Sequence, residues 1–264
     1  MMRWMLKRSD FIQQGFETRE PEIAADRYIQ ALNEVGRDIS GGSVLVLGYG
    51  GYFGLGVALL RRGARHVTLC DPYAKLDHNA NRALADSTTP YLQVIGRKTV
   101  VNPEWITLIH KDIQSVAPEF EQSFDHVFSS SVYEHLENVD GTTAALAHVS
   151  SSGCFHLHFI DLRDHYFRYP FEMLCYTDWV WRTFLNPDSN LNRLRAWRYE
   201  AVFRKYFQNV KWETLESDLK GFRDAEKRIH PEFRSGEEQL DAITRILVHA
   251  SNPLTNASKA GRDY

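Results

Sequence analysis

Apolar and polar positions alternate in blocks along the first 160 residues. Short, continuous apolar runs are typical of buried parallel strands, whereas a 3.6-residue apolar stripe indicates a covering helix. The apolar runs predict strands over residues 43–47, 66–70, 105–109, 124–129 and 154–160. The striped segments predict helices over residues 21–35, 53–62, 76–86 and 140–149. This alternation predicts a parallel sheet with right-handed helical crossovers.

The last hundred residues depart from this alternation. Residues 171–207 are rich in aromatic side chains and predict two helical pieces, broken at Asn186-Pro187. Residues 211–215 and 242–250 predict two late strands joined by a long excursion, which indicates an antiparallel edge on the sheet. We therefore expect one α/β domain with a Rossmann-like, doubly wound, mostly parallel sheet. An antiparallel late strand pair and a helical insertion between the fifth and sixth strands complete this fold class.

Composition narrows the classes of partner. The chain has 31 basic and 34 acidic residues, a net charge of −3 and 43% hydrophobic residues, which is typical of a globular protein. This balance argues against a nucleic-acid partner. Residues 41–60 carry no charge and have the length of a membrane span, but seven glycines would break such a helix. We expect no membrane span.

Cysteine usage and the first residues of the chain bear on its compartment. Cys70, Cys154 and Cys175 are too few and too scattered for a disulfide framework or a zinc site. The first eight residues lack the apolar region of a signal peptide. Both observations predict a reducing, cytoplasmic location.

A glycine-rich turn follows the first predicted strand. Gly48 and Gly50 come between this strand and the next helix, where absent Cβ atoms and free N–H groups let a nucleotide approach the backbone. Asp71 ends the second strand, 23 residues after Gly48, where its carboxylate can accept hydrogen bonds from ribose hydroxyls. A dinucleotide fingerprint would require a third glycine at the position of Phe53, or at Leu59 in the alternative frame. Neither frame fits NAD.

The glycine-rich turn instead resembles the first motif of class I S-adenosylmethionine-dependent methyltransferases. The resemblance extends to Lys111-Asp112-Ile113 after the third strand, and to the FDHVFSSSVYEHL segment that begins at Phe124 and contains Glu134-His135. It covers residues 43–160. One position departs from the pattern, because Val46 stands where the family usually has an acidic residue that helps to hold the cofactor.

The resemblance implies S-adenosyl-L-methionine as cofactor. The cofactor-binding residues that it implies are Gly48, Tyr49, Gly50, Asp71, Pro72, Asp112, Ile113 and Ser130. Within one domain of residues 1–264, we expect an N-terminal helical cap (1–40), a cofactor-binding core (41–160), an aromatic helical acceptor or lid segment (161–209) and C-terminal strands (210–250).

A second group of polar residues surrounds the end of the fifth strand. His156 and His158 share a face of that strand, and an Asp161-Leu-Arg-Asp164-His165 run follows them. This run and the later Asn192-Arg-Leu-Arg195 resemble methyltransferases encoded with polysaccharide and cell-surface genes. A divalent metal held by Asp161, Asp164 and His165 stays open as an alternative, but our prediction includes no metal.

The loop after the fourth strand bears on the methyl acceptor. Its sequence, Ser129-Ser-Ser-Val-Tyr133, lacks the N-P-P-Y motif of enzymes that methylate exocyclic amines, so a small-molecule, sugar or lipid-linked acceptor is favoured. A hydroxyl acceptor requires a base, and imidazole titrates near neutral pH. We predict His165 as that base, oriented by Asp164, with His135 as the second candidate.

Several alternatives stay open from the sequence. The chain is either an O-methyltransferase, an NAD(P)-dependent oxidoreductase or epimerase, or a non-catalytic cofactor-binding protein. The aromatic residues of the 161–209 segment either line an acceptor pocket or form a core. Arg193, Arg195 and Arg198 either pair with an anionic acceptor or form a solvated helix face. The sequence does not predict the oligomeric state.

Overall fold

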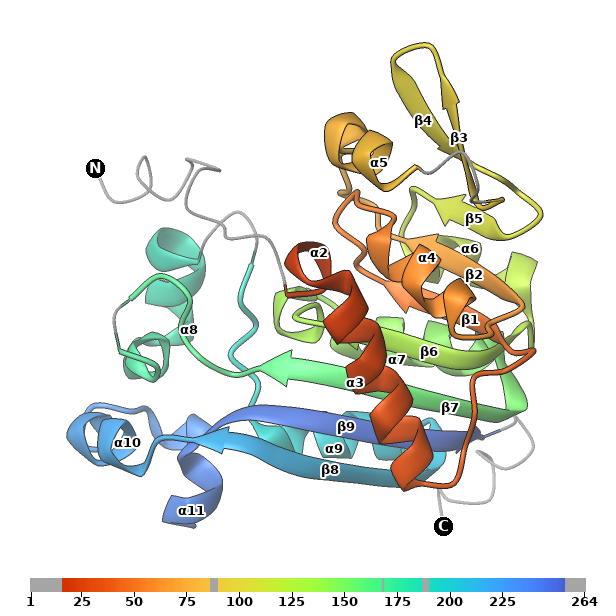
Figure 1. The fold of residues 1–264 in the computed structure, drawn as a ribbon. Coiled ribbons are helices and arrows are strands. Elements are labelled where there is room, and N and C mark those ends of the chain that lie inside the picture. The colour runs from red at the N-terminus through yellow and green to blue at the C-terminus, as the bar shows by residue number, and fades with distance from the viewer. Residues whose placement is uncertain (1–15, 86–89, 168, 187–189, 255–264) are drawn as a thin grey trace.

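A mixed sheet of seven strands forms the centre of the computed structural model, which describes residues 16–85, 90–167, 169–186 and 190–254 (Figure 1). The strand order is β5-β2-β1-β6-β7-β9-β8, and neighbours are parallel except that β9 runs antiparallel to β7 and β8. The strands are β1 (Ser43–Leu47), β2 (His66–Cys70), β5 (Ile106–Ile109), β6 (Phe124–Ser130), β7 (Ser150–Asp161), β8 (Phe207–Ser217) and β9 (Ile243–Pro253). The predicted fold class, with its antiparallel late pair, is confirmed.

Helices cover both faces of the sheet. In Figure 1, α3 and α4 lie in front of the strands, and α6, α7 and α9 lie behind them. Side chains alternate along β1: Val44 and Val46 pack into the cluster under α3 and α4, and Leu45 and Leu47 into the cluster on the opposite face. The helices and helical turns are α2 (Phe16–Arg19), α3 (Pro21–Glu34), α4 (Gly54–Arg61), α5 (His78–Leu84), α6 (Ile113–Val116), η2 (Ala117–Phe120), η3 (Tyr133–His135), α7 (Val139–Val149), η4 (Glu172–Cys175), α8 (Asp178–Val180), the π-helical turn η5 (Trp181–Leu185), α9 (Ala196–Arg204), α10 (Leu219–Ala225), η6 (Pro231–Phe233) and α11 (Glu238–Asp241). No helix among these is long and apolar enough to cross a membrane.

The structure differs from the sequence prediction in two segments. A hairpin of β3 (Leu92–Ile95) and β4 (Lys98–Val101) projects from the sheet, where no strands were predicted. The 171–207 segment contains short helical turns and one regular helix, α9, instead of two long helices. Asn190 and Arg193 have positive φ angles, which interrupt any helix between η5 and α9. Pro187 of the predicted break lies outside the described residues.

The inserted segment and the connection between β8 and β9 form a small core together beyond the carboxyl end of β7. Figure 1 shows α8, α10 and α11 grouped there. Phe171, Trp181, Phe222 and Phe233 are buried together, so part of the aromatic segment is core. Other aromatic side chains of the segment are exposed, namely Tyr169, Trp179 and Phe184.

A chain of buried polar side chains crosses the interior between β6 and β7. The Ser150 hydroxyl donates to the Leu146 carbonyl (2.6 Å), so it accepts from His156 Nε2 (2.8 Å). His156 Nδ1 then accepts from His158 Nε2 (3.2 Å), and His158 Nδ1 accepts from the Ser129 hydroxyl (2.7 Å). Burial lowers the pKa of His156 well below its ordinary value and that of His158 to about 3. Both imidazoles are therefore neutral core residues.

This arrangement makes the free energy of unfolding depend on pH. Histidines in the unfolded chain take up protons below pH of about 6.5, whereas buried His158 does so only near pH 3. Stability from each depressed histidine is complete above pH 6.5 and falls by about 1.4 kcal/mol per pH unit below it. We expect His158→Asn to reduce this slope by about one proton in urea unfolding between pH 7 and 4.5. His148→Gln, at an exposed position, is the control. An unchanged slope in His158→Asn would contradict the assignment.

Candidate active site

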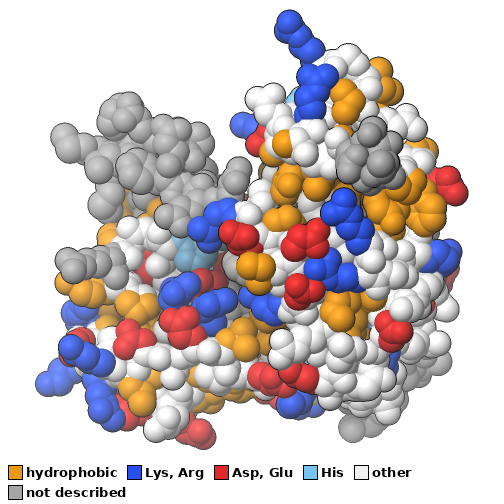
Figure 2. All heavy atoms as spheres, viewed as in Figure 1, with side chains coloured by type: hydrophobic (Ala, Val, Ile, Leu, Met, Phe, Trp, Pro, Cys, Tyr) orange, Lys and Arg blue, Asp and Glu red, His pale blue; other side chains and the backbone are white. Residues whose placement is uncertain are grey.

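One large cavity, with a volume of about 1570 Å³, opens at the carboxyl edge of the parallel strands. Residues that follow β1, β2, β5, β6 and β7 line it, together with residues from the start of β9 and the end of β8. In the space-filling view, acidic and basic side chains gather between the sheet region and the lobe that contains α8 and α10 (Figure 2). The topology thus brings together side chains that lie far apart in the sequence.

Asp71 and Gly48 form one end of this cavity. Asp71 follows β2, and its Oδ2 accepts from the Gly50 amide (3.0 Å) while Oδ1 accepts from the Tyr73 amide (2.9 Å). Gly48 has a φ of +81°, a conformation that favours glycine, and a Cβ there would lie 2.3 Å from Val132 Cγ2. The glycine turn and the loop after β6 are therefore in close contact, and Asp71 holds the turn in place.

The loop after β5 contributes a second acidic group. Asp112 caps α6 by accepting from the Gln114 amide (2.9 Å), and its side chain is exposed at the cavity. Ile113 is the first residue of α6, so its amide has no partner within the helix. A carboxylate and a backbone N–H therefore lie side by side at this edge.

Of the eight predicted cofactor-binding residues, six line the cavity: Gly48, Asp71, Pro72, Asp112, Ile113 and Ser130. The Tyr49 side chain is buried instead, stacks on Phe53 and lies 3.5 Å from His110 Nδ1 through its hydroxyl. Gly50 contacts Asp71 but is not among the lining residues. Val46 is fully buried in the apolar cluster under α3, where an acidic side chain would be desolvated.

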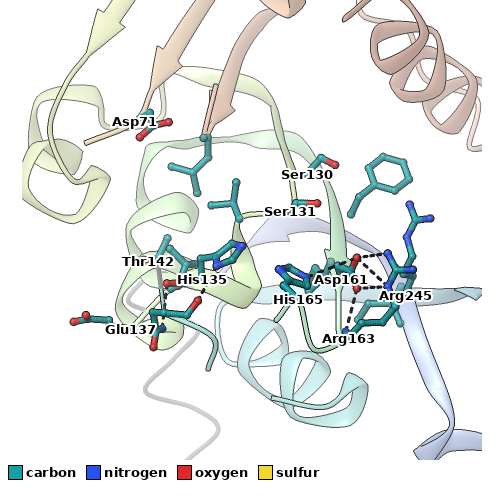
Figure 3. A pocket seen from close by; sticks show the side chains of 18 of the residues that line it. Asp71, Ser130, Ser131, His135, Glu137, Thr142, Asp161, Arg163, His165 and Arg245 are labelled. Atoms are coloured by element: carbon teal, nitrogen blue, oxygen red, sulfur yellow. Dashed lines mark hydrogen bonds and ion pairs between the residues drawn. The ribbon is translucent and has the colours of Figure 1, made fainter. Parts of the chain in front are cut away.

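All three predicted catalytic residues line the same cavity. His135, in the turn after β6, donates from Nδ1 to the Asn190 carbonyl, 2.7 Å away. The His165 ring follows β7, and its centroid lies 5.3 Å from that of His135. Figure 3 shows the two imidazoles next to each other, with Asp71 on one side and Arg163 and Arg245 on the other.

The carboxylate beside His165 is Asp161, whereas Asp164 was expected in that place. His165 Nε2 lies 3.8 Å from Asp161 Oδ2. Asp164 Oδ1 accepts from the amides of Tyr166 and Phe167 instead, which shapes the loop. Burial raises the pKa of Asp164. Burial also raises the pKa of Asp161, but contacts with His165 and Arg163 outweigh it and hold that pKa well below its usual range.

Glu134 lies behind these residues, with its side chain buried. Burial raises its pKa to about 8, and the neighbouring Asp161 carboxylate adds to the rise. Glu134 Oε1 accepts from the Asp161 amide (3.4 Å). Glu134 is therefore neutral at pH 7 and supports the strand end that carries Asp161.

Three arginines that line the cavity, Arg19, Arg27 and Arg245, were not predicted from the sequence. Arg27, on α3, donates to the Ser130 hydroxyl (3.2 Å) and lies 3.6 Å above the Phe159 ring. Arg245 interrupts the apolar run of β9, which was a signal in the sequence. Neither alternative proposed for Arg193 and Arg195 holds, because both guanidinium groups are buried and donate to backbone carbonyls.

Comparison with known proteins assigns the fold to a function class. Residues 45–157 match the family model of a methyltransferase domain. These residues form an S-adenosylmethionine-dependent methyltransferase domain. This confirms the resemblance, the enzyme class and the cofactor that it implied. No functionally curated protein is similar enough in sequence to match the chain.

Solved structures of low sequence identity share the fold of this methyltransferase. Phosphoethanolamine N-methyltransferase 2 from Haemonchus contortus, in complex with S-adenosyl-L-methionine, is 14% identical with a TM-score of 0.53; the match covers 96% of this chain and 60% of that one. The [4+2]-cyclase SpnF is 13% identical, with a TM-score of 0.51 and coverage of 92% and 85%. A sarcosine dimethylglycine methyltransferase from Galdieria sulphuraria is 13% identical, with a TM-score of 0.52 and coverage of 88% and 86%.

The groups at the Asp71 end of the cavity suit S-adenosylmethionine. Asp71 uses one acceptor position on each oxygen for backbone amides, and a carboxylate has about four such positions. Two positions are left for the ribose hydroxyls. The Ile113 amide and the Asp112 carboxylate would face the adenine ring, whose edge both accepts and donates hydrogen bonds.

We expect Asp71→Asn to weaken binding of S-adenosylhomocysteine at least tenfold. The variant removes a charged acceptor, and hydrogen bonds to charged groups contribute about 1.5–3 kcal/mol. Calorimetric titration of the variant and the unmodified methyltransferase measures the change. Asp38→Asn is the matched control, because the Asp38 carboxylate also accepts a local backbone amide, that of Ser40, but lies outside the cavity. Equal affinity in Asp71→Asn and the unmodified enzyme would defeat the assignment.

Proposed function

We propose that this methyltransferase transfers the methyl group to a hydroxyl oxygen of a small-molecule, sugar or lipid-linked acceptor. The observation that carries the proposal is the pair of imidazoles, His135 and His165, in the middle of the cavity. Deprotonation of a hydroxyl as the methyl group arrives requires a base at this place. The acceptor would therefore lie between the imidazoles and the arginine end.

The contacts of the two imidazoles favour His165 as the base. Asp161 faces Nε2 of His165, so we assign the proton of the neutral ring to that nitrogen. Nδ1 is then the nitrogen that takes the proton of the acceptor, and Asp161 stabilises the imidazolium that forms. This makes Asp161 the positioning residue, in the role first proposed for Asp164. His135 has its Nδ1 proton committed to the Asn190 carbonyl.

S-adenosylmethionine supplies an electrophilic methyl group on its sulfonium. The contribution of the chain is to hold the acceptor oxygen in line with that group and to take its proton, since close, aligned reactants account for most of the rate gain in such a transfer. The loops after β2 and β5 would hold the nucleoside, while the loops after β6 and β7 face the acceptor. The residues that would bind the nucleoside and those that face the acceptor therefore follow different strands at one edge of the sheet.

The proposal includes a cytoplasmic location and no nucleic-acid partner. Three cysteines without disulfide partners support a reducing compartment. The near-neutral charge balance argues against a nucleic-acid partner. A panel of hydroxyl compounds, each paired with the corresponding amine, tests the acceptor class through release of S-adenosylhomocysteine. We expect turnover with hydroxyl compounds; turnover with the amines alone would refute O-methylation.

We expect His165→Gln to lower methyl transfer by about 10²–10⁴-fold, the usual effect of losing a general base. Affinity for S-adenosylhomocysteine should change less than threefold, because His165 lies beyond the nucleoside end. Turnover and calorimetric titration of the same preparations give both quantities. Asp161→Asn should lose less activity than His165→Gln, and Asp161→Glu should restore part of it by retaining a carboxylate.

The exposed His148→Gln is the matched control for these variants. If His165→Gln turns over at the normal rate while His135→Gln does not, the base is His135. If both turn over normally, neither imidazole is the base and the mechanism fails. A loss of cofactor binding in step with turnover would assign the histidines a structural role.

A further inference from the structure

A row of charged side chains crosses the sheet at the end of the cavity opposite Asp71. Asp161 on β7 is the direct register partner of Arg245 on β9, and Arg245 is the partner of Glu216 on β8. Direct cross-strand partners on adjacent strands point to the same face of the sheet. Arg163 extends the row and contacts Asp161 through two nitrogens. All four side chains line the cavity.

Arg245 has unused donors within this row. Its guanidinium lies 3.6 Å from Glu216, which is longer than a hydrogen bond, and it makes no hydrogen bond to any described residue. Glu216 is shared with Arg163, at 3.7 Å. The Thr244 hydroxyl, buried at the same cavity, also has no hydrogen-bond partner in the described part of the chain. The guanidinium fork of Arg245 therefore faces the cavity with its donors available.

Three guanidinium groups at this end, those of Arg27, Arg163 and Arg245, line the cavity with the carboxyl groups of Asp161, Asp164, Glu216 and Asp218. Asp164 and Asp218 accept from backbone amides of their own loops. Asp161 is already paired with Arg163 through a bidentate contact. Burial lowers the pKa of Arg27, and the neighbouring Arg245 guanidinium contributes to the fall. Two guanidinium groups that repel each other across a cavity gain most from an anion placed between them.

We propose that the methyl acceptor carries an oxyanion group, carboxylate or phosphate, which binds Arg245 and Arg27 while the hydroxyl faces His165. This inference rests on the proposed function and names the substrate class of its site. Asp71 and Arg245 lie on opposite sides of the two imidazoles in Figure 3, so Arg245 belongs to the acceptor side of the cavity. The anion is therefore part of the acceptor and not of the cofactor.

Anion titrations in the presence of saturating S-adenosylhomocysteine test the proposal, because the cofactor end is then filled. Inorganic phosphate and acetate serve as probes at constant ionic strength, balanced with chloride, and calorimetry gives the dissociation constants. We expect Arg245→Met to bind the preferred anion at least fivefold more weakly than the unmodified protein does. The anion affinity of Arg245→Lys should lie between those of Arg245→Met and the unmodified protein, because lysine keeps the charge but loses the planar fork.

Arg204→Met is the matched control, since Arg204 is an exposed, ion-paired arginine on α9 outside the cavity.

Preference for phosphate indicates a phosphorylated acceptor, and preference for acetate a carboxylic acid; either supports the proposal. It is overturned if the unmodified protein binds neither anion, or if Arg245→Met binds as well as Arg204→Met. It is also overturned if Arg245→Met loses S-adenosylhomocysteine itself, because the arginine would then serve the cofactor. Failure of the proposed function shows separately, as turnover with the amines alone in the acceptor panel, which leaves the anion titrations unaffected.

Discussion

The carboxyl edge of the sheet depends on one buried guanidinium. Arg195 is fully buried and donates to the carbonyls of Leu162 (3.1 Å), Asp241 (2.9 Å) and Ile243 (2.5 Å). Leu162 directly follows β7, Asp241 ends α11 and Ile243 begins β9, so Arg195 joins the ends of the two strands that carry Asp161 and Arg245. Burial lowers the pKa of Arg195 to about 10, so it stays charged at neutral pH. Leaving these carbonyls unpaired would cost about 1–3 kcal/mol each, a large share of the 5–15 kcal/mol that stabilises a typical domain.

Residues 190–195, the stretch that ends at Arg195, also fix the loop that carries His135. The Asn192 side chain donates to the carbonyls of Tyr133 (2.7 Å) and Leu136 (3.1 Å), and its backbone amide donates to the Glu134 carbonyl (2.9 Å). Asn192 and Arg195 thus connect the loop after β6 with the ends of β7 and β9. Because both contacts come from one short stretch of chain, the distance between the two imidazoles is set by backbone geometry and not by the imidazoles themselves.

The sequence predicted those parts of the fold that short-range patterns determine. Strands β1 and β2 have the predicted bounds, because each is a continuous apolar run ended by glycine or aspartate. The 190–195 segment could not be predicted, since its conformation depends on hydrogen bonds to residues 33 to 59 positions away. The same contrast between local patterns and distant contacts holds for the residues of the site. Residues that directly follow strands were identified from topology, whereas Arg27 reaches the cavity only through the packing of α3 on the sheet.

The neighbouring carboxyl groups of Glu134 and Asp161 differ in charge because their surroundings differ. Glu134 is buried without a cationic partner in hydrogen-bonding contact among the described residues, so burial keeps it protonated, with a pKa of about 8. Asp161 is less buried and contacts Arg163 and His165, which keep it ionised. If both groups were ionised, their repulsion would weaken the strand end, and if both were protonated, His165 would lose its counter-charge. The neutral Glu134 lets the negative charge of the edge remain on Asp161, which is the carboxylate that faces His165.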